Sequence, residues 1–465
     1  MATQEVTTLP AAGATRLLDP LFRTAEMGAI FSDAHFIECM LAFELALSRA
    51  LALTGVAPAA AIPAIERTTL PALFDVGMLA EQARQAGNVA IPFVNALNEL
   101  VAKTNPEAAK FVHWGATSQD VLDTALVLQL GEAFFIFDDS LAKLADALAA
   151  LAEKHKSTVL AGRTWLQHGP PITLGLKAAG WLSAIERHRV RLKATAVQVR
   201  TLQFGGAVGT LAVLGERGRG VAAALAAELK LELPDLPWHS HRDRFAEVAT
   251  NLGLLTATLG KMARDVSLLM QTEVAEASEP CTPGRGGSST MPHKRNPVGS
   301  AVVLAATTRV PGLVSTMLSA MVQEHERGLG GWQAEWETLP VICLLAAGAL
   351  SHTHYMVRGL VVDEKQMQKN LETTHGLIFA EAVTMALGGK VGRSAAHSRV
   401  EALCRRALTN SRHLREEILQ DAEICAHLSV SEIDQLFDPR KYLGSAEAFV
   451  ERVLSLHKKK VQVQP

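Results

Sequence analysis

Apolar residues recur along the middle of the chain at the spacing of an amphipathic helix, with steps that alternate between three and four residues. The clearest run comprises Phe245, Val248, Leu252, Leu255, Leu259, Met262, Val266 and Leu269. A seam of this kind is typical of a long helix packed at a shallow angle in a bundle. Similar runs cover residues 126–151 and 182–199, so we expect several long helices with these positions in the core.

The expected length of these helices bears on the number of chains in the molecule. A helix of about 35 residues spans about 50 Å, which is far longer than the ordinary helix of a globular domain. A single chain cannot easily cover such a rod on all sides. We therefore expect an oligomer in which several copies contribute their long helices to one core.

Helical patterns of a different character flank this region. Ser32 is a plausible N-cap for a helix that starts at Asp33 and stops near Gly55, and shorter helices broken by prolines follow. Residues 302–321 and 339–357 predict two more long apolar helices, joined by a polar connection, and the periodic segments shorten beyond residue 363. We predict an all-α fold of three domains, at residues 1–112, 113–362 and 363–465. Extended backbone is expected only near residues 210–214.

Charge and composition exclude several classes of function. The net charge of −2 gives no electrostatic reason to expect a nucleic-acid partner. The N-terminus lacks a basic segment followed by an apolar run, and we expect no uncharged apolar stretch of membrane length. The five cysteines are scattered and lack CxxC spacing, which favours free thiols in a reducing compartment. The sequence therefore predicts a cytoplasmic protein with neither nucleic-acid nor membrane partners.

Two histidine pairs have a spacing that suits zinc on a strand, His239 with His241 and His352 with His354. Both pairs occur in helical or polar-loop context, which favours solvated or capping histidines. Cys281 borders a Gly-rich loop but has no nearby base, so we interpret it as structural. We expect no metal site.

The stretch 282–297, TPGRGGSSTMPHKRNP, interrupts two of the long apolar helical patterns. Its glycines can turn backbone N–H groups toward a ligand, and its prolines remove donors and fix the backbone, so the loop can present amides and hydroxyls to an anion. Most loops of this composition only connect their neighbours, but the position between two core helices favours a function. The loop lacks the GK followed by Ser or Thr of a Walker phosphate loop.

Three blocks resemble the fumarase/aspartase superfamily. They are GSSTMPHKRNP in this loop, HWGATSQD at residues 113–120 and GRTWLQHGPPITLG at residues 162–175. With the long helices, the resemblance covers almost the whole chain. It implies an all-α fold of three domains, a homotetramer around a twenty-helix bundle, and active sites assembled from one block of each of three subunits. It implies a small-molecule substrate and no metal or organic cofactor.

The resemblance also implies roles for residues of the signature loop. Enzymes of this superfamily remove a proton next to a carboxylate and form an aci-carboxylate dianion, so their sites need a base and concentrated positive charge. Ser288 matches the catalytic base, a serine alkoxide. The loop glycine amides and the Lys294 ammonium are suited to lowering the pKa of this hydroxyl. Lys294 and Asn296 match residues that hold the substrate carboxylate.

The other two blocks supply further matches. Thr117 and Ser118 match hydroxyls that bind a substrate carboxylate, and Gln167 matches a substrate-contacting residue. Arg327 resembles an anion-binding arginine of the adenylosuccinate lyase branch. His113 matches an active-site histidine of that branch, although a lone histidine is more often structural, so both interpretations stay open.

Two departures from the superfamily pattern carry information about the reaction. Trp165 stands in the second block where most members have a general-acid histidine, and Ala301 stands where its glutamate partner is usual. Loss of both partners suggests a leaving group that needs no proton. A carboxylate, with a pKa near 4, leaves unaided. His168 could substitute as an acid, but the mechanism does not require one, and Trp165 is then a substrate-binding candidate.

These departures make the resemblance strongest to the lactonising members of the superfamily. That resemblance implies reversible lactonisation of 3-carboxy-cis,cis-muconate, in the protocatechuate branch of aromatic degradation. The alternative is a lyase of the adenylosuccinate or argininosuccinate kind that releases fumarate, against which Leu21 and Phe22 replace an expected Arg-Tyr pair. A third alternative, a non-catalytic scaffold such as a lens crystallin, is disfavoured because the loop and carboxylate-binding residues are retained.

Overall fold

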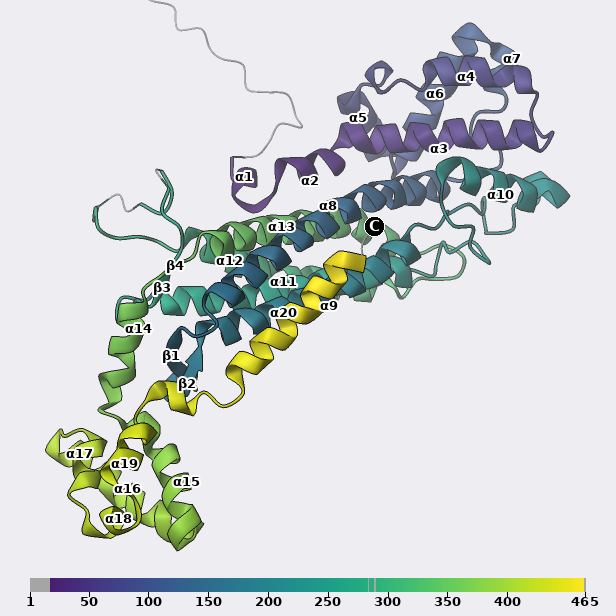
Figure 1. Ribbon diagram of the computed structural model, residues 1–465. Helices are drawn as coiled ribbons and strands as arrows, with labels where there is room; N and C mark the ends of the chain where they lie inside the picture. The colour runs from purple at the N-terminus through teal and green to yellow at the C-terminus, as the bar shows by residue number, and fades with distance from the viewer. Residues whose placement is uncertain (1–16, 283, 288–289, 464–465) are drawn as a thin grey trace, which may run out of the picture. The chain divides into compact units, whose positions relative to one another are not determined.

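The computed structural model describes residues 17–463 with the exception of residues 283, 288 and 289. Within these residues the chain is predominantly helical (Figure 1), which confirms the predicted all-α class. Contacts divide it into two compact units. The first contains residues 17–141, 188–259 and 302–351, and the second contains residues 142–187, 260–301 and 352–463.

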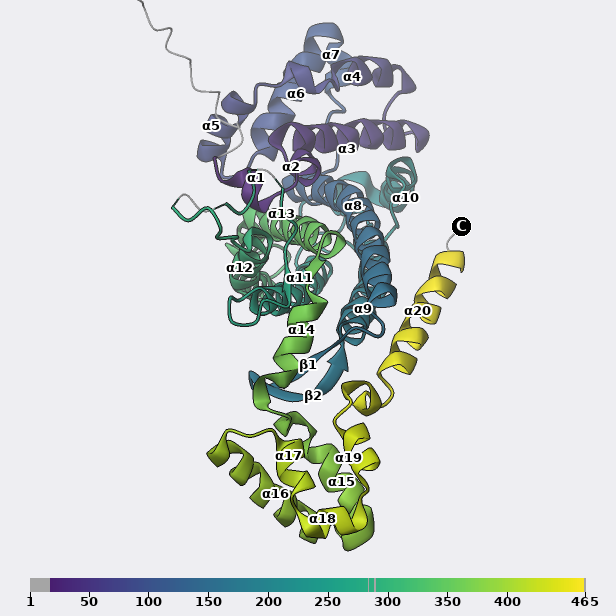
Figure 2. The ribbon, with the colours of Figure 1, turned by 60° about the vertical axis from the view of Figure 1, so that its left-hand side comes forward.

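From residue 17 onward, seven α-helices precede the long-helix region, in agreement with the helical pattern predicted for this part of the chain. Their bounds are α1 Asp19–Phe22, α2 Ala25–Ile30, α3 Asp33–Leu53, α4 Ile62–Thr68, α5 Val76–Ala86, α6 Ala90–Thr104 and α7 Pro106–Ala109. Ser32 caps α3 as predicted, because its hydroxyl accepts a hydrogen bond from the His35 amide at 3.2 Å. Helix α10, Gly218–Leu229, lies along α3 (Figure 2).

Five long helices follow from the predicted seams. They are α8 Ser118–Lys154, α9 Leu174–Val199, α11 Asp243–Leu269, α12 Val298–Ala320 and α13 Gly331–Arg358. Every residue of the run from Phe245 to Leu269 that the sequence placed in the core is at most 4% exposed. The 37 residues of α8 reach the expected length of about 35, whereas α11 has 27. Because α13 starts at Gly331, the connection before it is shorter than predicted.

Short helices dominate the C-terminal part of the second unit. They are α14 Glu364–Leu371, α15 Ala380–Val391, α16 Arg393–Asn410, α17 Leu414–Leu419, α18 Ala422–His427, α19 Val430–Leu436 and α20 Ala446–Val463. Helices α15 to α19 gather around a shared apolar core that includes Val383, Leu403 and Ile418 (Figure 1, Figure 2). The small helical region expected beyond residue 363 is therefore present.

The prediction of extended backbone near residues 210–214 is wrong. Leu211 has a left-handed backbone, and a 3₁₀ helix, Ala212–Arg217, follows it. The structure instead contains a hairpin of β1 Val159–Thr164 and β2 Gln167–Thr173, and a two-residue pair, β3 Ala277–Ser278 with β4 Val361–Val362. The hairpin escaped prediction because two prolines interrupt the second strand and no Asn-Gly or Asp-Gly marks the turn.

Two helices are long and apolar enough to cross a membrane by length and composition alone, α12 and α13. This contradicts the expectation that the chain has no stretch of that kind. In α13, 67% of the apolar window is buried inside the fold, as in the core helix of a soluble protein, which passes the same test. In α12 only 28% is buried, so this helix presents apolar surface that the described residues of the chain leave uncovered.

Candidate active site

In the first unit, His113 is fixed by a carboxylate from a distant helix. Glu44 of α3 accepts a hydrogen bond from the His113 backbone amide at 3.1 Å, and its other oxygen lies 2.5 Å from the His113 Nδ1 atom. The Glu44 side chain is 1% exposed. His113 has a φ of 57°, an uncommon backbone conformation for a residue with a side chain. The two bonds to Glu44 hold it in that conformation and orient the ring.

The surroundings of His113 also favour its charged form. Burial lowers the pKa of the imidazole, but the ion pair and hydrogen bond with Glu44, together with the charge of Asp120, outweigh burial and raise the pKa above its ordinary value. The imidazolium therefore persists to a higher pH than in a free histidine. With Nδ1 engaged by Glu44, the Nε2 side is the one with which this ring can donate to an anion.

Asp120 organises the backbone of the first block. It is fully buried in α8 and accepts hydrogen bonds from the Thr117 amide at 3.0 Å and from the amides of residues 205 and 206 at 3.0 and 2.9 Å. The His239 Nε2 atom lies 2.7 Å from Asp120 Oδ1, the oxygen that also accepts from the residue 205 amide. His239 is buried, so the interpretation of this residue as a solvated or capping histidine is wrong. These bonds fix the turn that carries Thr117 and Ser118.

Thr117 and Arg327, two of the predicted anion-binding residues, are in contact in the first unit, and Ser118 follows Thr117. The Arg327 Nη1 atom donates to the Thr117 hydroxyl at 3.0 Å, and Nη2 donates to the Ala207 carbonyl at 2.9 Å. Ser118 is the first residue of α8, where unpaired amides and the helix dipole favour negative charge. The structure thus brings together Arg327 and Thr117, which lie 210 residues apart in the sequence.

The second block forms the β1–β2 hairpin of the second unit, and its tip is exposed. Trp165 and Leu166 are 98% and 77% exposed, with φ angles of 53° and 64°. Two successive positive φ angles are those of a type I′ turn, which most often contains Asn or Gly. Gln167 follows as the first residue of β2 and is also exposed. In the single chain, the hairpin thus exposes Trp165 and Gln167 to solvent.

A buried ion pair anchors the base of this hairpin. The Arg163 guanidinium donates to both oxygens of Glu276, at 2.9 and 2.6 Å, and the Glu276 side chain is fully buried. His168 pairs with Arg163 in the register of the two strands. Burial and the Arg163 charge lower the pKa of His168, although Glu276 opposes them. Near neutral pH His168 is therefore largely uncharged, which weakens the hypothesis that it substitutes as an acid.

A single carboxylate clamps both ends of the signature loop. Glu279, which precedes the loop, accepts hydrogen bonds from the Gly299 amide at 2.8 Å and from the amide and hydroxyl of Ser300, both at 2.7 Å. Gly299 and Ser300 belong to the first turn of α12. An anion at a helix N-terminus is favourable, so Glu279 also stabilises this end of α12.

A second set of hydrogen bonds joins the two sides of the loop between residues 286–287 and residues 295–296. The Asn296 amide donates to the Gly286 carbonyl at 2.8 Å, and Gly287 pairs with Arg295 as an isolated bridge. The Asn296 side chain makes a longer bond, 3.4 Å, to the Gly287 carbonyl. Lys294 is exposed at the tip. Ser288, the predicted base, lies outside the described residues.

Arg285 fastens the first half of the loop to α13. Its guanidinium stacks on the Tyr355 ring, 4.1 Å from the centroid, and Nη2 lies 2.9 Å from the His352 Nδ1 atom. The Tyr355 hydroxyl is 3.0 Å from the Thr282 hydroxyl. His352, one of the candidate zinc histidines, thus lies beside a cation, which disfavours a metal ion there.

Comparisons with known proteins agree with the family that the three sequence blocks predict. A family described as lyase matches residues 22–312, and one described as adenylosuccinate lyase C-terminus matches residues 376–453. The chain is 55% identical to the 3-carboxy-cis,cis-muconate cycloisomerase of Pseudomonas aeruginosa, over 96% of this chain and 97% of that protein. The chain belongs to the fumarase/aspartase family. This membership confirms the family, the enzyme class and the fold predicted from the sequence.

Two further members of this family are similar over their full length. The 3-carboxy-cis,cis-muconate cycloisomerase of Bradyrhizobium diazoefficiens is 50% identical, over 94% of this chain and 97% of that protein. The crystal structure of 3-carboxy-cis,cis-muconate lactonizing enzyme from Pseudomonas putida superposes with a TM-score of 0.91 at 50% identity, covering 96% of this chain and 100% of that one.

Two residues that hold parts of the candidate site in place were not identified from the sequence, Glu44 and Glu279. Glu44 lies 69 residues before its partner His113, so no motif spacing connects them. One signal was available: Glu44 falls on the apolar face of α3 between Met40 and Leu47, where an unpaired charge would be costly. Glu279 gave no such signal, because its partners are mainly backbone amides of a loop and a helix start.

Proposed function

We propose that this enzyme catalyses the reversible lactonisation of 3-carboxy-cis,cis-muconate. The observation that carries the proposal is the set of curated cycloisomerases of that name, which are 46–55% identical over at least 90% of the chain. They bear out the function predicted from the sequence, where Trp165 and Ala301 replace the usual general-acid histidine and its glutamate partner. The residue roles given below are our inference from local geometry and chemistry.

The residues at the positions of the usual histidine–glutamate pair fit a reaction in which no acid delivers a proton to the leaving group. Trp165 and Ala301 have no titratable group, and the lowered pKa of His168 leaves little imidazolium at neutral pH. Hydroxide, ammonia or an amine would leave slowly from such a site, because each must take up a proton. A substrate carboxylate needs none. The lactone C–O bond can therefore form or break without a general acid at oxygen.

Proton transfer at carbon is the step that we assign to Ser288. In the lactonising direction, a carboxylate oxygen attacks the diene and forms the C–O bond. The displaced electron pair moves onto a neighbouring carboxylate to give the aci-carboxylate dianion. The Ser288 hydroxyl then protonates carbon and becomes an alkoxide, and in the reverse direction the alkoxide removes the same proton.

Several cationic groups of the chain are suited to binding the carboxylates of the tricarboxylate substrate. In the first unit, Arg327 lies on the Thr117 hydroxyl at the start of α8, and His113 is held as an imidazolium by Glu44. In the second unit, Lys294 is exposed on the signature loop. We assign these groups to carboxylate binding, with Arg327 and Thr117 as the anchor, since a guanidinium suits planar recognition of a carboxylate.

We also propose a homotetramer with shared active sites. The support is the uncovered apolar surface of α12 and the exposed Trp165 and Leu166 at the hairpin tip, because surfaces of this kind mark sites of association. The three sequence blocks would then meet from different copies. We further propose a cytoplasmic location, since all five cysteines are free.

The substrate assignment predicts a clear difference between two assays. Purified protein is expected to consume 3-carboxy-cis,cis-muconate, measured as loss of the absorbance of its conjugated diene, and to release no fumarate from adenylosuccinate. The physical reason is that adenylosuccinate cleavage expels a purine amine, which needs the acid that this site lacks. Release of fumarate from adenylosuccinate with the muconate untouched would instead establish the alternative lyase.

Replacing Glu44 by glutamine is expected to change the pH dependence of substrate binding. The pKa of His113 is raised in the wild type, so its charge is lost only as pH rises through that raised value. In Glu44→Gln the carboxylate no longer opposes burial, and the charge is lost at a lower pH. The pH above which KM rises should therefore move down, as measured by kcat and KM across the pH range.

The matched control for this variant is Glu66→Gln, which removes an exposed carboxylate that pairs with Arg49 elsewhere in the first unit. Its KM profile should follow the wild type. A Glu44→Gln profile that coincides with that of the wild type would show that His113 does not bind substrate in its charged form.

A further inference from the structure

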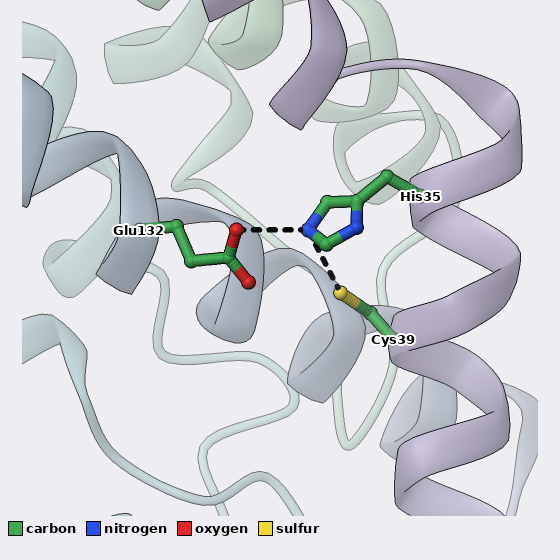
Figure 3. Close-up of side chains that lie close together, drawn as sticks. All are labelled: His35, Cys39 and Glu132. Atoms are coloured by element: carbon green, nitrogen blue, oxygen red, sulfur yellow. Dashed lines mark hydrogen bonds and ion pairs between the residues drawn. The ribbon is translucent and has the colours of Figure 1, made fainter. Parts of the chain in front are cut away.

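A histidine, a cysteine and a glutamate outside the proposed active site converge between two helices of the first unit (Figure 3). His35 and Cys39 lie on successive turns of α3, and Glu132 faces them from α8. The His35 Nε2 atom is 3.1 Å from a Glu132 oxygen and 3.7 Å from the Cys39 sulfur. All three potential ligand atoms lie within 4.8 Å of one another, so one ion could contact them together.

The two separations measured from Nε2 are close to those of a tetrahedral metal site. Bonds of about 2.0–2.1 Å to nitrogen and oxygen and about 2.3 Å to sulfur, at tetrahedral angles, place ligand atoms about 3.3–3.6 Å apart. The two distances from Nε2 to Glu132 and Cys39 bracket this range. Thiolate, imidazole and carboxylate are also the three ligand types that zinc takes in proteins.

The second nitrogen of His35 has the partner that metal-bound histidines usually have. Nδ1 lies 2.8 Å from a Glu38 oxygen, one turn along the same helix. A carboxylate in this position fixes the tautomer with the proton on Nδ1 and leaves Nε2 as a ligand. The arrangement is independent of the three converging atoms, because Glu38 points at the opposite side of the ring.

A cavity of about 370 Å³ adjoins the cluster and provides room for a fourth ligand. His35, Glu38, Cys39 and Glu132 line it, together with apolar residues of α8 and the Arg200 side chain. A water molecule in this cavity could complete a tetrahedron around an ion. Sites with three protein ligands keep a position of this kind for water.

We propose that His35, Cys39 and Glu132 bind one zinc-type divalent cation that links α3 to α8. Binding forms bonds to Nε2, the sulfur and a carboxylate oxygen, and it breaks the S–H bond of Cys39, whose proton passes to solvent. One thiolate and one carboxylate then balance the two charges of the ion. None of these residues belongs to the proposed catalytic machinery, so the site is independent of the proposed function.

The position on α3 gives the ion a structural role. Glu44, which holds His113, lies nine residues after His35 on the same helix, or about 13 Å along its axis. A bond network that joins the start of α3 to α8 would stabilise this helix pair. Binding to the folded state alone raises stability in proportion to the logarithm of free metal over its dissociation constant.

Titration with cobalt(II) and zinc chloride tests the proposal. The full-length protein, free of any affinity tag and treated with chelator, should bind one equivalent of cobalt per chain with a sulfur-to-cobalt charge-transfer band, which zinc displaces. Cys39→Ser should lose the band, and Glu132→Gln should bind at least about tenfold more weakly, a difference of about 1.4 kcal/mol. Glu38→Gln should weaken binding about 10- to 100-fold.

Cys425→Ser is the matched control, because Cys425 is an exposed free thiol in the second unit. It should keep both the stoichiometry and the band. Because Glu132 is exposed, the Glu132→Gln variant tests the site without disturbing the core. Absence of saturable metal binding to the wild type would reduce the cluster to an ion pair between two helices, and so would cobalt binding by Cys39→Ser and Glu132→Gln that is as tight as that of the wild type. Neither result would bear on the muconate assay.

Discussion

Replacing Ser288 by alanine is expected to lower kcat by about 10² to 10⁴, the usual contribution of a positioned acid or base. In our proposed mechanism this hydroxyl is the group that carries the proton to and from carbon, and the alanine methyl cannot replace it. Substrate binding should change little, because carboxylate binding is assigned to Arg327, Thr117 and Lys294. The measurement is kcat and KM for 3-carboxy-cis,cis-muconate in both proteins.

The neighbouring Ser289→Ala variant is the control, since the proposed mechanism gives Ser289 no role. It should retain near-normal turnover. Light scattering should give both variants a mass about four times the 49.8 kDa of the chain, so that loss of assembly is not mistaken for loss of chemistry. If Ser288→Ala keeps activity within about tenfold of the wild type, less than about 1.4 kcal/mol of the barrier depends on this hydroxyl, and its assignment as the base is wrong.

The Arg242→Ala variant is expected to lose about 3–5 kcal/mol of stability, the usual effect of breaking a buried ion pair. Arg242 is 2% exposed and donates to Asp123 of α8 at 2.6 and 3.0 Å and to Glu335 of α13 at distances down to 2.6 Å. Without the guanidinium, two buried carboxylates face each other unpaired. Burial raises the pKa of Glu335 even beside Arg242. The midpoint of urea unfolding, followed by circular dichroism at fixed protein concentration, measures the loss.

Arg244→Ala provides the comparison, because Arg244 is half-buried in the first turn of α11, two residues after Arg242, and its guanidinium lies 5.9 Å from the centroid of the Trp238 ring. It should be destabilised much less. The variant Arg242→Lys should fall between the two, since lysine keeps the charge but lacks the planar fork that reaches both carboxylates. Equal unfolding midpoints for Arg242→Ala and Arg244→Ala would show that the ion pairs of Arg242 with Asp123 and Glu335 do not stabilise the first unit.

Periodicity predicted the long helices because their packing is local in sequence. In α11, each turn repeats the same contact with the core, so the positions from Phe245 to Leu269 could be identified without knowing their partners. The β1–β2 hairpin lacks a comparable pattern. Its turn residues Trp165 and Leu166 adopt positive φ angles that their side chains disfavour, and only the surrounding strand pairing specifies them.

The candidate site divides in the same way. Thr117, Ser118, Lys294 and Asn296 were found because they lie in contiguous blocks that resemble a known family. The residues that orient side chains of these blocks come from distant parts of the sequence. Glu44 orients His113, and His239 contacts Asp120. A buried charge on a helix predicts that a partner exists, but it does not predict which residue that partner is. The three-domain division and the catalytic roles stay predictions.

The clamp at Glu279 has a consequence for chain entropy. It holds residues 299 and 300 against residue 279, so the signature loop is a ring whose ends are already together. The bond between the Asn296 amide and the Gly286 carbonyl closes a second ring inside the first and leaves a tip of about half the length. Closure entropy grows with the logarithm of length, and each halving lowers its cost by about 0.6 kcal/mol. The inner bond therefore limits the length of chain that the first ring leaves free to vary, and it does so without any contact from α12.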